Sequence, residues 1–594
     1  MKLARLTFPS ARSSTWPALS FAVSATLLGA AAWRVWTRLG RPAAGIDDAD
    51  ITLVYARNLA AGHGFVYNVG GERVEGASSP LWTLFAAAVS RLTASPEPIL
   101  AGASVLALSL ALVLLMHAMA RASVDGFASA SPKGIRAPDG SRTHPPIESI
   151  FAAATVLLWT LASPEFVAWT CLSLMETGIW CAALVAAVAI LIGWLGGPRA
   201  DANPPRALAL LAVAITLLRP EGALVSLLIL GSAAAMKAIR RQTGRDLLFR
   251  LGPAAAAVVA TAVVSTIVRL LYFGVPLPNT FYAKIGNEFG YELEQGWTYL
   301  KDFCRANPAA PIAILAGISM SAFFLGPRRG QAAPTTMLAG PGERTLWISL
   351  LLLALLAVPI LLGGDHFGGF RFYQPVWPIL ALPFAFAIQG TRALRFPRPI
   401  GILLAAVIAA ASVFLAHAGS ESTWKRPGRL PIRLEFEIAV KGREVGRALG
   451  RLFCSEDLPA VGVITAGGVK LVYPGPVYDL MGMNWTPMAH AGRNRRGERG
   501  HAAFDASVFW SAPPDILVAS VLYQGARPMT PMQQSFENQV LDGLLFDPEF
   551  AQVYRFGRLS RPGGNETEAI VGYVRRDFLA ARTGLEFTSW QAAR

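Results

Sequence analysis

Two adjacent acidic residues, Asp47 and Asp48, have the residue types and spacing in this sequence that best suit proton transfer. They stand just where the first long apolar run ends. Adjacent carboxylates repel each other, and nearby low-dielectric material disfavours their charged forms, so the pKa of one partner rises toward neutral pH. The pair is therefore a candidate general base, and either residue can be the one that takes the proton. The alternative to a catalytic role is a solvated acidic loop, paired with cations, that only reflects membrane topology.

The elements that must position this pair are membrane-spanning helices. Of the 594 residues, 53% are hydrophobic and only 15% charged, whereas about 25% are charged in an average soluble domain. Near-continuous apolar runs of about 18 to 22 residues recur, the length that a helix needs to cross a bilayer. They are 17–37, 98–120, 149–170, 176–197, 253–275, 309–326, 346–363, 373–390 and 399–417.

One further apolar stretch, 207–236, is interrupted by Arg219-Pro220-Glu221-Gly222, which predicts two short helices that meet at one membrane surface. The sequence thus predicts a polytopic α-helical membrane protein with about eleven transmembrane helices. The segment 79–93 is expected in the outer membrane interface. Counting it as a span would place the later basic loops on the outer side, against the positive-inside rule.

The net charge of +15 indicates membrane topology and not a nucleic-acid partner, because the basic residues sit in short loops between apolar runs. By the positive-inside rule, the N-terminus and the loops around 237–250, 328–344 and 392–398 are cytoplasmic. The loops 38–97, 276–308 and 363–372 then face outward. So does everything after about residue 418.

Hydrophobic density drops after residue 417, which predicts a transmembrane domain over 1–417 and a soluble domain over 418–594. Residues 434–453 have helical spacing of apolar side chains. Short apolar runs at 461–465 and 515–522 are typical of strands. The C-terminal domain is therefore expected to be α/β or mixed, on the outer side of the membrane.

Short polar motifs recur at the predicted outer loops and helix ends. In chain order they are Asp47-Asp48 with Tyr55-Ala56-Arg57-Asn58-Leu59, Gly70 to Trp82, Leu174-Met175-Glu176-Thr177-Gly178, Leu218 to Gly222, Pro278 to Lys284, Gly363 to Phe367 with Arg371-Phe372, and Tyr478 to Asn484. In this order, from about residue 45 to 490, they resemble the GT-C glycosyltransferases. More narrowly, they are similar to the family of mycobacterial terminal arabinofuranosyltransferases. Independently of that resemblance, their shared outer position predicts that they converge on one cavity.

The resemblance implies a glycosyltransferase of the bacterial inner membrane with the GT-C fold. Such an enzyme transfers a sugar from a polyprenyl-phosphate donor to a cell-envelope glycan or lipid on the outer side. Arabinofuranose is the candidate sugar. Asp47 or Asp48 would be the base that deprotonates the acceptor hydroxyl. Lys284, Arg371 and Arg219 are the cations placed to hold the donor phosphate; anchoring at the membrane interface is the alternative for each.

Further candidate substrate-binding residues come from the same motifs. They are Tyr55, Arg57, Glu176, Glu221, Asn279, Asp365, His366 and Asp479. Glu176 and Glu221 lie near membrane depth, where ionisable groups are usually paired or functional, and Glu221 has Arg219 as a possible partner. No cofactor is expected; a divalent metal at Asp365 and His366 is the alternative to a sugar contact there.

No Walker loop, dinucleotide-binding glycine motif or His-Glu-x-x-His motif occurs, so neither a nucleotide-driven pump nor a nucleotide-sugar enzyme has a visible site. A transporter or flippase of a lipid-linked sugar is the alternative from another class, using the same polar groups without chemistry. A non-catalytic envelope assembly protein is a third.

Overall fold

The computed structural model describes most of the chain in twelve stretches. They are 15–130, 146–196, 204–239, 244–285, 288–325, 341–394, 396–418, 431–453, 457–491, 503–524, 531–563 and 568–590. Of the basic segments used above to orient the chain, 1–14, 240–243 and 326–340 lie outside the described residues.

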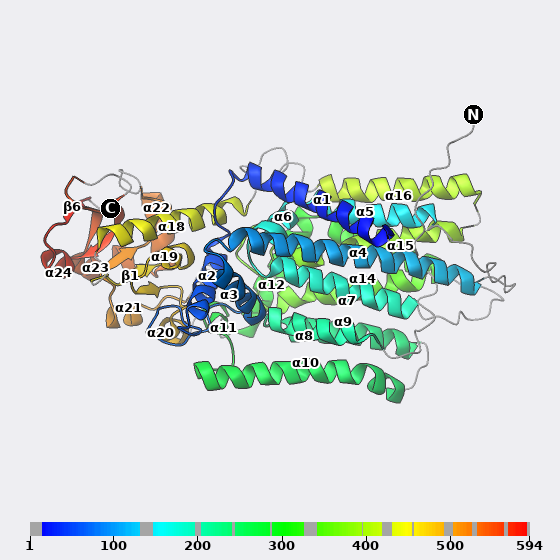
Figure 1. The fold of residues 1–594 in the computed structure, drawn as a ribbon, viewed down its shortest axis with the longest axis horizontal. Helices are drawn as coiled ribbons and strands as arrows, with labels where there is room; N and C mark the ends of the chain where they lie inside the picture. Colours follow the sequence, from blue (N-terminus) through cyan, green and yellow to red (C-terminus); the bar gives the residue numbers. More distant parts are fainter. Residues whose placement is uncertain are drawn as a thin grey trace.

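The N-terminal two thirds of the chain is a bundle of helices that run side by side along the long axis of the molecule (Figure 1). Its helices are α1 Thr15–Arg38, α2 Asp47–Ala60, α3 Pro80–Leu92, α4 Glu97–Ala130, α5 Ile147–Ala162, α6 Pro164–Val167, α7 Thr177–Gly196, α8 Arg206–Leu218, α9 Gly222–Ile239, α10 Gly244–Phe273, α11 Asn279–Lys284, α12 Phe289–Ala306, α13 Ala309–Leu325, α14 Pro341–Leu361, α15 Leu382–Gly390 and α16 Arg398–Ala418. The multi-pass membrane prediction is confirmed in this coarse form.

Six of the described helices are long and apolar enough to cross a membrane by themselves, namely α1, α4, α7, α10, α14 and α16. Two bent helix pairs raise the number to eight, fewer than the eleven spans expected. One pair bends by 77° between α5 and Pro164–Leu172, and the other by 88° between α12 and α13. The first break falls at Pro164, which cannot donate the backbone hydrogen bond that would continue the helix.

The other expected spans are apolar helices shorter than the rest. The stretch 207–236 forms α8 and α9, which pack against each other and are joined at Arg219–Glu221, as predicted. The expected span 373–390 is instead two 3-10 turns, Gln374–Val376 and Ile379–Ala381, followed by α15. Pro375, Pro378 and Pro383 account for this broken start.

The helix α7 lies at the centre of the bundle, with 17 of its 20 residues buried. It is apolar all round and rich in alanine, so it can pack on every side, most extensively against α4. At one end of the bundle the short helices α2 and α3 pack against each other and cross the direction of the long helices (Figure 1). The segment 79–93 is therefore a short helix at the end of the bundle.

The C-terminal region, drawn from yellow to red in Figure 1, holds a six-stranded mixed sheet next to that end of the bundle. The strands are β1 Val461–Val463, β2 Val477–Asp479, β3 Ile516–Val518, β4 Tyr554–Ser560, β5 Ile570–Arg575 and β6 Glu586–Ser589, in the order β2-β1-β3-β5-β4-β6. β1 pairs in parallel with β2 and β3, and the remaining pairs are antiparallel. The predicted mixed character is confirmed.

Helices accompany these strands. They are α18 Arg433–Leu452, α19 Gly467–Val472, α20 Thr486–Ala491, α21 Ala506–Ser511, α22 Pro531–Val540, α23 Pro548–Val553 and α24 Arg576–Ala580. α18 begins one residue from the predicted start at 434, and its apolar side packs on α19. Both α18 and α19 also contact α2, so the C-terminal region rests on the helix that begins with the acidic pair.

A buried ion cluster joins α18 to the bundle. The guanidinium of Arg443 contacts both carboxylate oxygens of Asp50, at 2.6 and 2.8 Å, and Oε1 of Glu97 at 2.9 Å. Asp50 has no exposed surface, and burial raises its pKa while the hydrogen bonds and charge of Arg443 lower it. Removing one partner of such a pair strands the other charge in a low-dielectric interior.

We expect Arg443→Met to destabilise the protein by about 3 to 5 kcal/mol, because it leaves the carboxylate of Asp50 buried without its cation. Thermal unfolding of the purified protein, followed by intrinsic fluorescence, measures this. The matched control is Arg433→Met on the same helix, where an exposed pair with Glu437 is lost and the cost is about 0 to 1 kcal/mol. Equal effects of the two variants would contradict a docking role for Arg443.

Candidate functional site

A cavity of about 180 Å³, rich in charged side chains, lies where α2, the loop 76–79, the junction of α8 and α9, α11, α12 and the segment 362–372 come together. Its lining includes Asp48, Thr52, Ser78, Ser79, Glu176, Arg219, Glu221, Thr280, Lys284, Glu292, Asp365, His366, Arg371 and Met483. Each of the polar motifs singled out in the sequence contributes at least one residue to this lining. The prediction that the motifs converge on one cavity agrees with this geometry.

The two members of the acidic pair have different surroundings. The carboxylate of Asp47 accepts hydrogen bonds from the backbone N–H groups of Gly467 at 2.9 Å and Gly468 at 2.7 Å, at the start of α19. A Cβ atom on Gly467 would overlap the backbone carbonyl of Asp47, so only glycine permits this approach. Burial raises the pKa of Asp47 to about 7, against the lowering effect of the two N–H groups. Asp47 therefore docks the C-terminal region and does not line the cavity.

Asp48 lines the cavity, with 17% of its side chain exposed. Its Oδ2 lies 3.6 Å from Nζ of Lys284 and 3.6 Å from Nη1 of Arg371. Adjacent residues of a helix point about 100° apart, so fixing Asp47 against α19 turns Asp48 away from it. Of the two candidate bases, Asp48 is the one that a ligand in the cavity would meet.

Arg371 is held in place by the residues around it. Its Nε donates to Oδ2 of Asp365 at 2.8 Å, and its guanidinium lies over the rings of Phe367 and Phe372, at 4.5 and 5.1 Å from their centroids. Oδ1 of Asp365 accepts from the backbone N–H of His366 at 3.0 Å. Asp365 thus orients Arg371, which contacts Asp48 together with Lys284.

Arg219 occupies a different electrostatic setting from the other two cations. It forms ion pairs with both Glu176, at 2.6 Å, and Glu221. Its guanidinium also lies over the rings of Trp180 and Phe372. Both ion pairs of Arg219 are shorter than the 3.6 Å contacts that Lys284 and Arg371 make with Asp48, so the two carboxylates hold Arg219 more firmly. The pairing of Arg219 with Glu221, weighed as an alternative from the sequence, is present.

Four predicted substrate-binding residues lie outside the cavity lining, at the contact with the C-terminal region. Tyr55 donates to Oδ1 of Asn484 at 3.0 Å and accepts from the N–H of Gly76, and Arg57 donates to the carbonyl of Leu471. Asn279 donates to the carbonyls of Gly482 and Met483. Asp479 is fully buried and accepts from Met481 and from both the backbone and the side chain of Asn484. These residues hold the walls of the cavity together.

Two acidic residues near the cavity were missed in the sequence. Glu292 lines it from α12, and its carboxylate lies so close to Gly363 that a Cβ atom there would clash with it. Glu435, on α18, is in electrostatic contact with Asp48, Asp47 and Asp365; burial first, and then these charges, raise its pKa to about 8. The sequence signal for Glu292 was its position on the same side of α12 as the buried apolar residues. Only the docking of α18 reveals Glu435.

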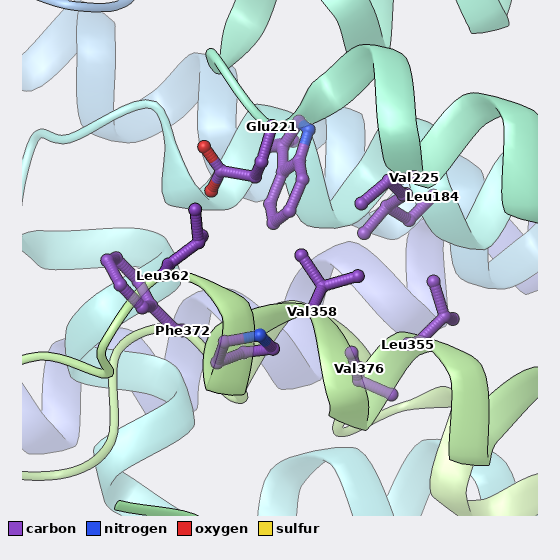
Figure 2. Close-up of a pocket in the computed structure, with 10 residues that line it drawn as sticks. Leu184, Glu221, Val225, Leu355, Val358, Leu362, Phe372 and Val376 are labelled. Carbon is purple, nitrogen blue, oxygen red and sulfur yellow. The ribbon is translucent and has the colours of Figure 1, made fainter. Parts of the chain in front are cut away.

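An apolar slot adjoins the polar cavity and shares Glu221, Leu362 and Phe372 with it. Figure 2 shows Val225 and Leu184 on one side facing Val358, Leu355 and Val376 on the other, with the Glu221 carboxylate at one end. The slot lies between α7, α9 and α14, within the bundle.

Metal ligation was the alternative considered for Asp365 and His366. Among the described residues, no group of three or more His, Cys, Asp or Glu side chains is arranged to hold a metal ion. The carboxylate of Asp365 contacts Arg371 and His366 instead.

Comparison of the sequence with models of known protein families and with curated proteins finds no match. The family resemblance therefore rests on the motifs alone.

We expect the stability of the protein to fall as pH rises from about 4.5 to about 8, in part because of Glu435. In the unfolded chain this carboxyl ionises near its ordinary pKa of 4.5, whereas in the folded protein it keeps its proton until about 8. Glu435→Gln should therefore gain stability relative to the wild type across this range and match it at pH 4. Thermal unfolding measured from pH 4 to 9 tests this.

The control for that titration is Glu437→Gln, an exposed neighbour on the same helix that pairs with Arg433. Its stability difference from the wild type should not grow over the same pH range. A pH-independent difference for Glu435→Gln would show that Glu435 does not lie among the carboxylates of the site.

Proposed function

We propose that this chain is a membrane glycosyltransferase of the GT-C type that transfers a sugar from a polyprenyl-phosphate donor to a cell-envelope glycan or lipid. The observation that carries the proposal is the meeting of Asp48, Lys284 and Arg371 in one cavity beside the membrane-spanning bundle. The acidic pair and the two cations come from separate motifs, spread over more than three hundred residues of sequence. Transfer on the outer side of a bacterial inner membrane and arabinofuranose as the sugar belong to the proposal through the resemblance.

In the proposed reaction, the oxygen of an acceptor hydroxyl attacks the anomeric carbon of the donor sugar. Asp48 accepts the proton of that hydroxyl as the attack proceeds. The bond between that carbon and the phosphate oxygen breaks, and polyprenyl phosphate leaves with the bonding electrons. Lys284 and Arg371 stabilise the negative charge that develops on the leaving phosphate. Atoms and charge balance without a further reactant.

The surroundings fit a donor that is anchored in lipid. A polyprenyl chain is costly to expose to water, so its phosphate is presented at the membrane surface while the chain remains in apolar material. The long apolar helices of the bundle supply such material beside the cavity, whereas the slot between α7, α9 and α14 holds only about 10 Å³. Of the other lining carboxylates, Asp365 holds Arg371, and Glu176, Glu221 and Glu292 are hydrogen-bond acceptors suited to sugar hydroxyls.

We expect Asp48→Asn to lower the rate of transfer about 10²- to 10⁴-fold, the usual contribution of a general base, and to retain donor binding. Asp47→Asn should lose less activity and also unfold at a lower temperature, because Asp47 acts through its contacts with α19. The assay uses the purified full-length protein with polyprenyl-phosphate sugars and envelope acceptors. It measures acceptor-dependent release of polyprenyl phosphate.

Asp302→Asn, an exposed residue of α12 paired with Arg305, is the matched control and should transfer at the wild-type rate. Unchanged transfer in both Asp47→Asn and Asp48→Asn would sink the assignment of the base. Movement of the lipid-linked sugar across a vesicle membrane, with no release of polyprenyl phosphate in the wild type, would instead identify a transporter.

A further inference from the structure

The carboxylate of Asp48 occupies the position where two cations converge. A single oxygen, Oδ2, lies 3.6 Å from both Nζ of Lys284 and Nη1 of Arg371. These are the two cations that an anionic group entering the cavity would meet. Asp48 and such an anion therefore compete for the same two partners.

The two cations form a site that is already assembled. Lys284 ends the short helix α11, and Arg371 is fixed by Asp365 and by the rings of Phe367 and Phe372. Arg371 is buried, with only 6% of its side chain exposed. Neither cation has to cross the cavity to reach a ligand that takes the place of the Asp48 carboxylate.

The charge of the cavity makes this competition decisive. The described residues that line it carry five carboxylates, those of Asp48, Glu176, Glu221, Glu292 and Asp365, against the three cations Arg219, Lys284 and Arg371. Arg219 is already paired with two of those carboxylates. An anion therefore enters a cavity with an excess of negative charge, and it gains full contact with Lys284 and Arg371 only when Asp48 gives up its own.

We propose that Asp48 is a displaceable internal occupant of an anion site, and that the phosphate of a lipid-linked donor binds Lys284 and Arg371 by taking its place. This inference rests on the proposed function and deepens it. The displaced carboxylate is released toward the cavity, where the acceptor hydroxyl binds. Donor binding thus comes first and frees the base, so the acceptor is activated only when a donor is present.

The test is the affinity of the full-length protein for two probes without sugar, inorganic phosphate and farnesyl phosphate, measured by isothermal titration calorimetry in detergent. Asp48→Asn should bind farnesyl phosphate about three- to tenfold more tightly than the wild type, because the competing carboxylate is gone. Asp48→Ala should show the same gain, which covers a folding defect in either variant. Lys284→Ala should lose most of the binding, both in the wild type and when combined with Asp48→Asn.

The matched control is Glu292→Gln, which removes the same charge from the same cavity at a position on α12. If general electrostatics were responsible, Glu292→Gln would gain as much as Asp48→Asn. The proposal would be overturned if the Asp48 variants gained no more affinity than Glu292→Gln. It would also be overturned if they gained none or lost affinity. Equal affinity of the wild type for inorganic and farnesyl phosphate would overturn its lipid-linked part.

The outcome is separable from that of the proposed function. A gain in phosphate affinity without any sugar transfer would uphold the anion site and reject the transferase. Sugar transfer that depends on Asp48, without a gain in phosphate affinity, would uphold the transferase and reject the displacement.

Discussion

The hydrogen bonds from the backbone of Gly467 and Gly468 to the carboxylate of Asp47 are the contact on which the rest of the site depends. They join the first residue of α2 to the first residues of α19, and so attach the C-terminal sheet to the helical bundle. Together with the contacts of Asp50, Tyr55 and Arg57, they set which side of α2 faces the C-terminal region. Asp48, the next residue, is thereby directed toward Lys284 and Arg371.

Several other charged residues are buried at this end of the molecule, and each of them is paired. Each buried charge needs a partner, because an isolated one is costly in a low-dielectric interior. Asp50 has Arg443, Glu75 has Arg269, and Arg219 has Glu176 and Glu221. Asp48 differs in that it remains partly exposed and shares its two cations with an open cavity. This difference sets Asp48 apart from the charged residues that hold the structure together.

Much of the fold follows from apolar run length, but the site depends on long-range contacts. Every predicted span corresponds to one or more helices, and the deviations fall at prolines such as Pro164 and Pro375. The shared outer position of the motifs predicted one cavity, because residues at the same ends of neighbouring helices meet. It did not separate Asp47 from Asp48, since only the partner at Gly467 distinguishes them. Arg443 carries a weak signal, as a charge seven residues after Phe436 on the buried side of α18; Glu435 carries none in the local sequence.

Asp47 docks α19, whereas Asp48 faces the cavity. Hydrogen–deuterium exchange at the amides of Gly467 and Gly468 tests this arrangement directly, in the wild type and in Asp47→Ala and Asp48→Ala. We expect slow exchange in the wild type and in Asp48→Ala, and faster exchange in Asp47→Ala, because only that variant removes the acceptor of both N–H groups. Equal protection of these amides in all three proteins would contradict it.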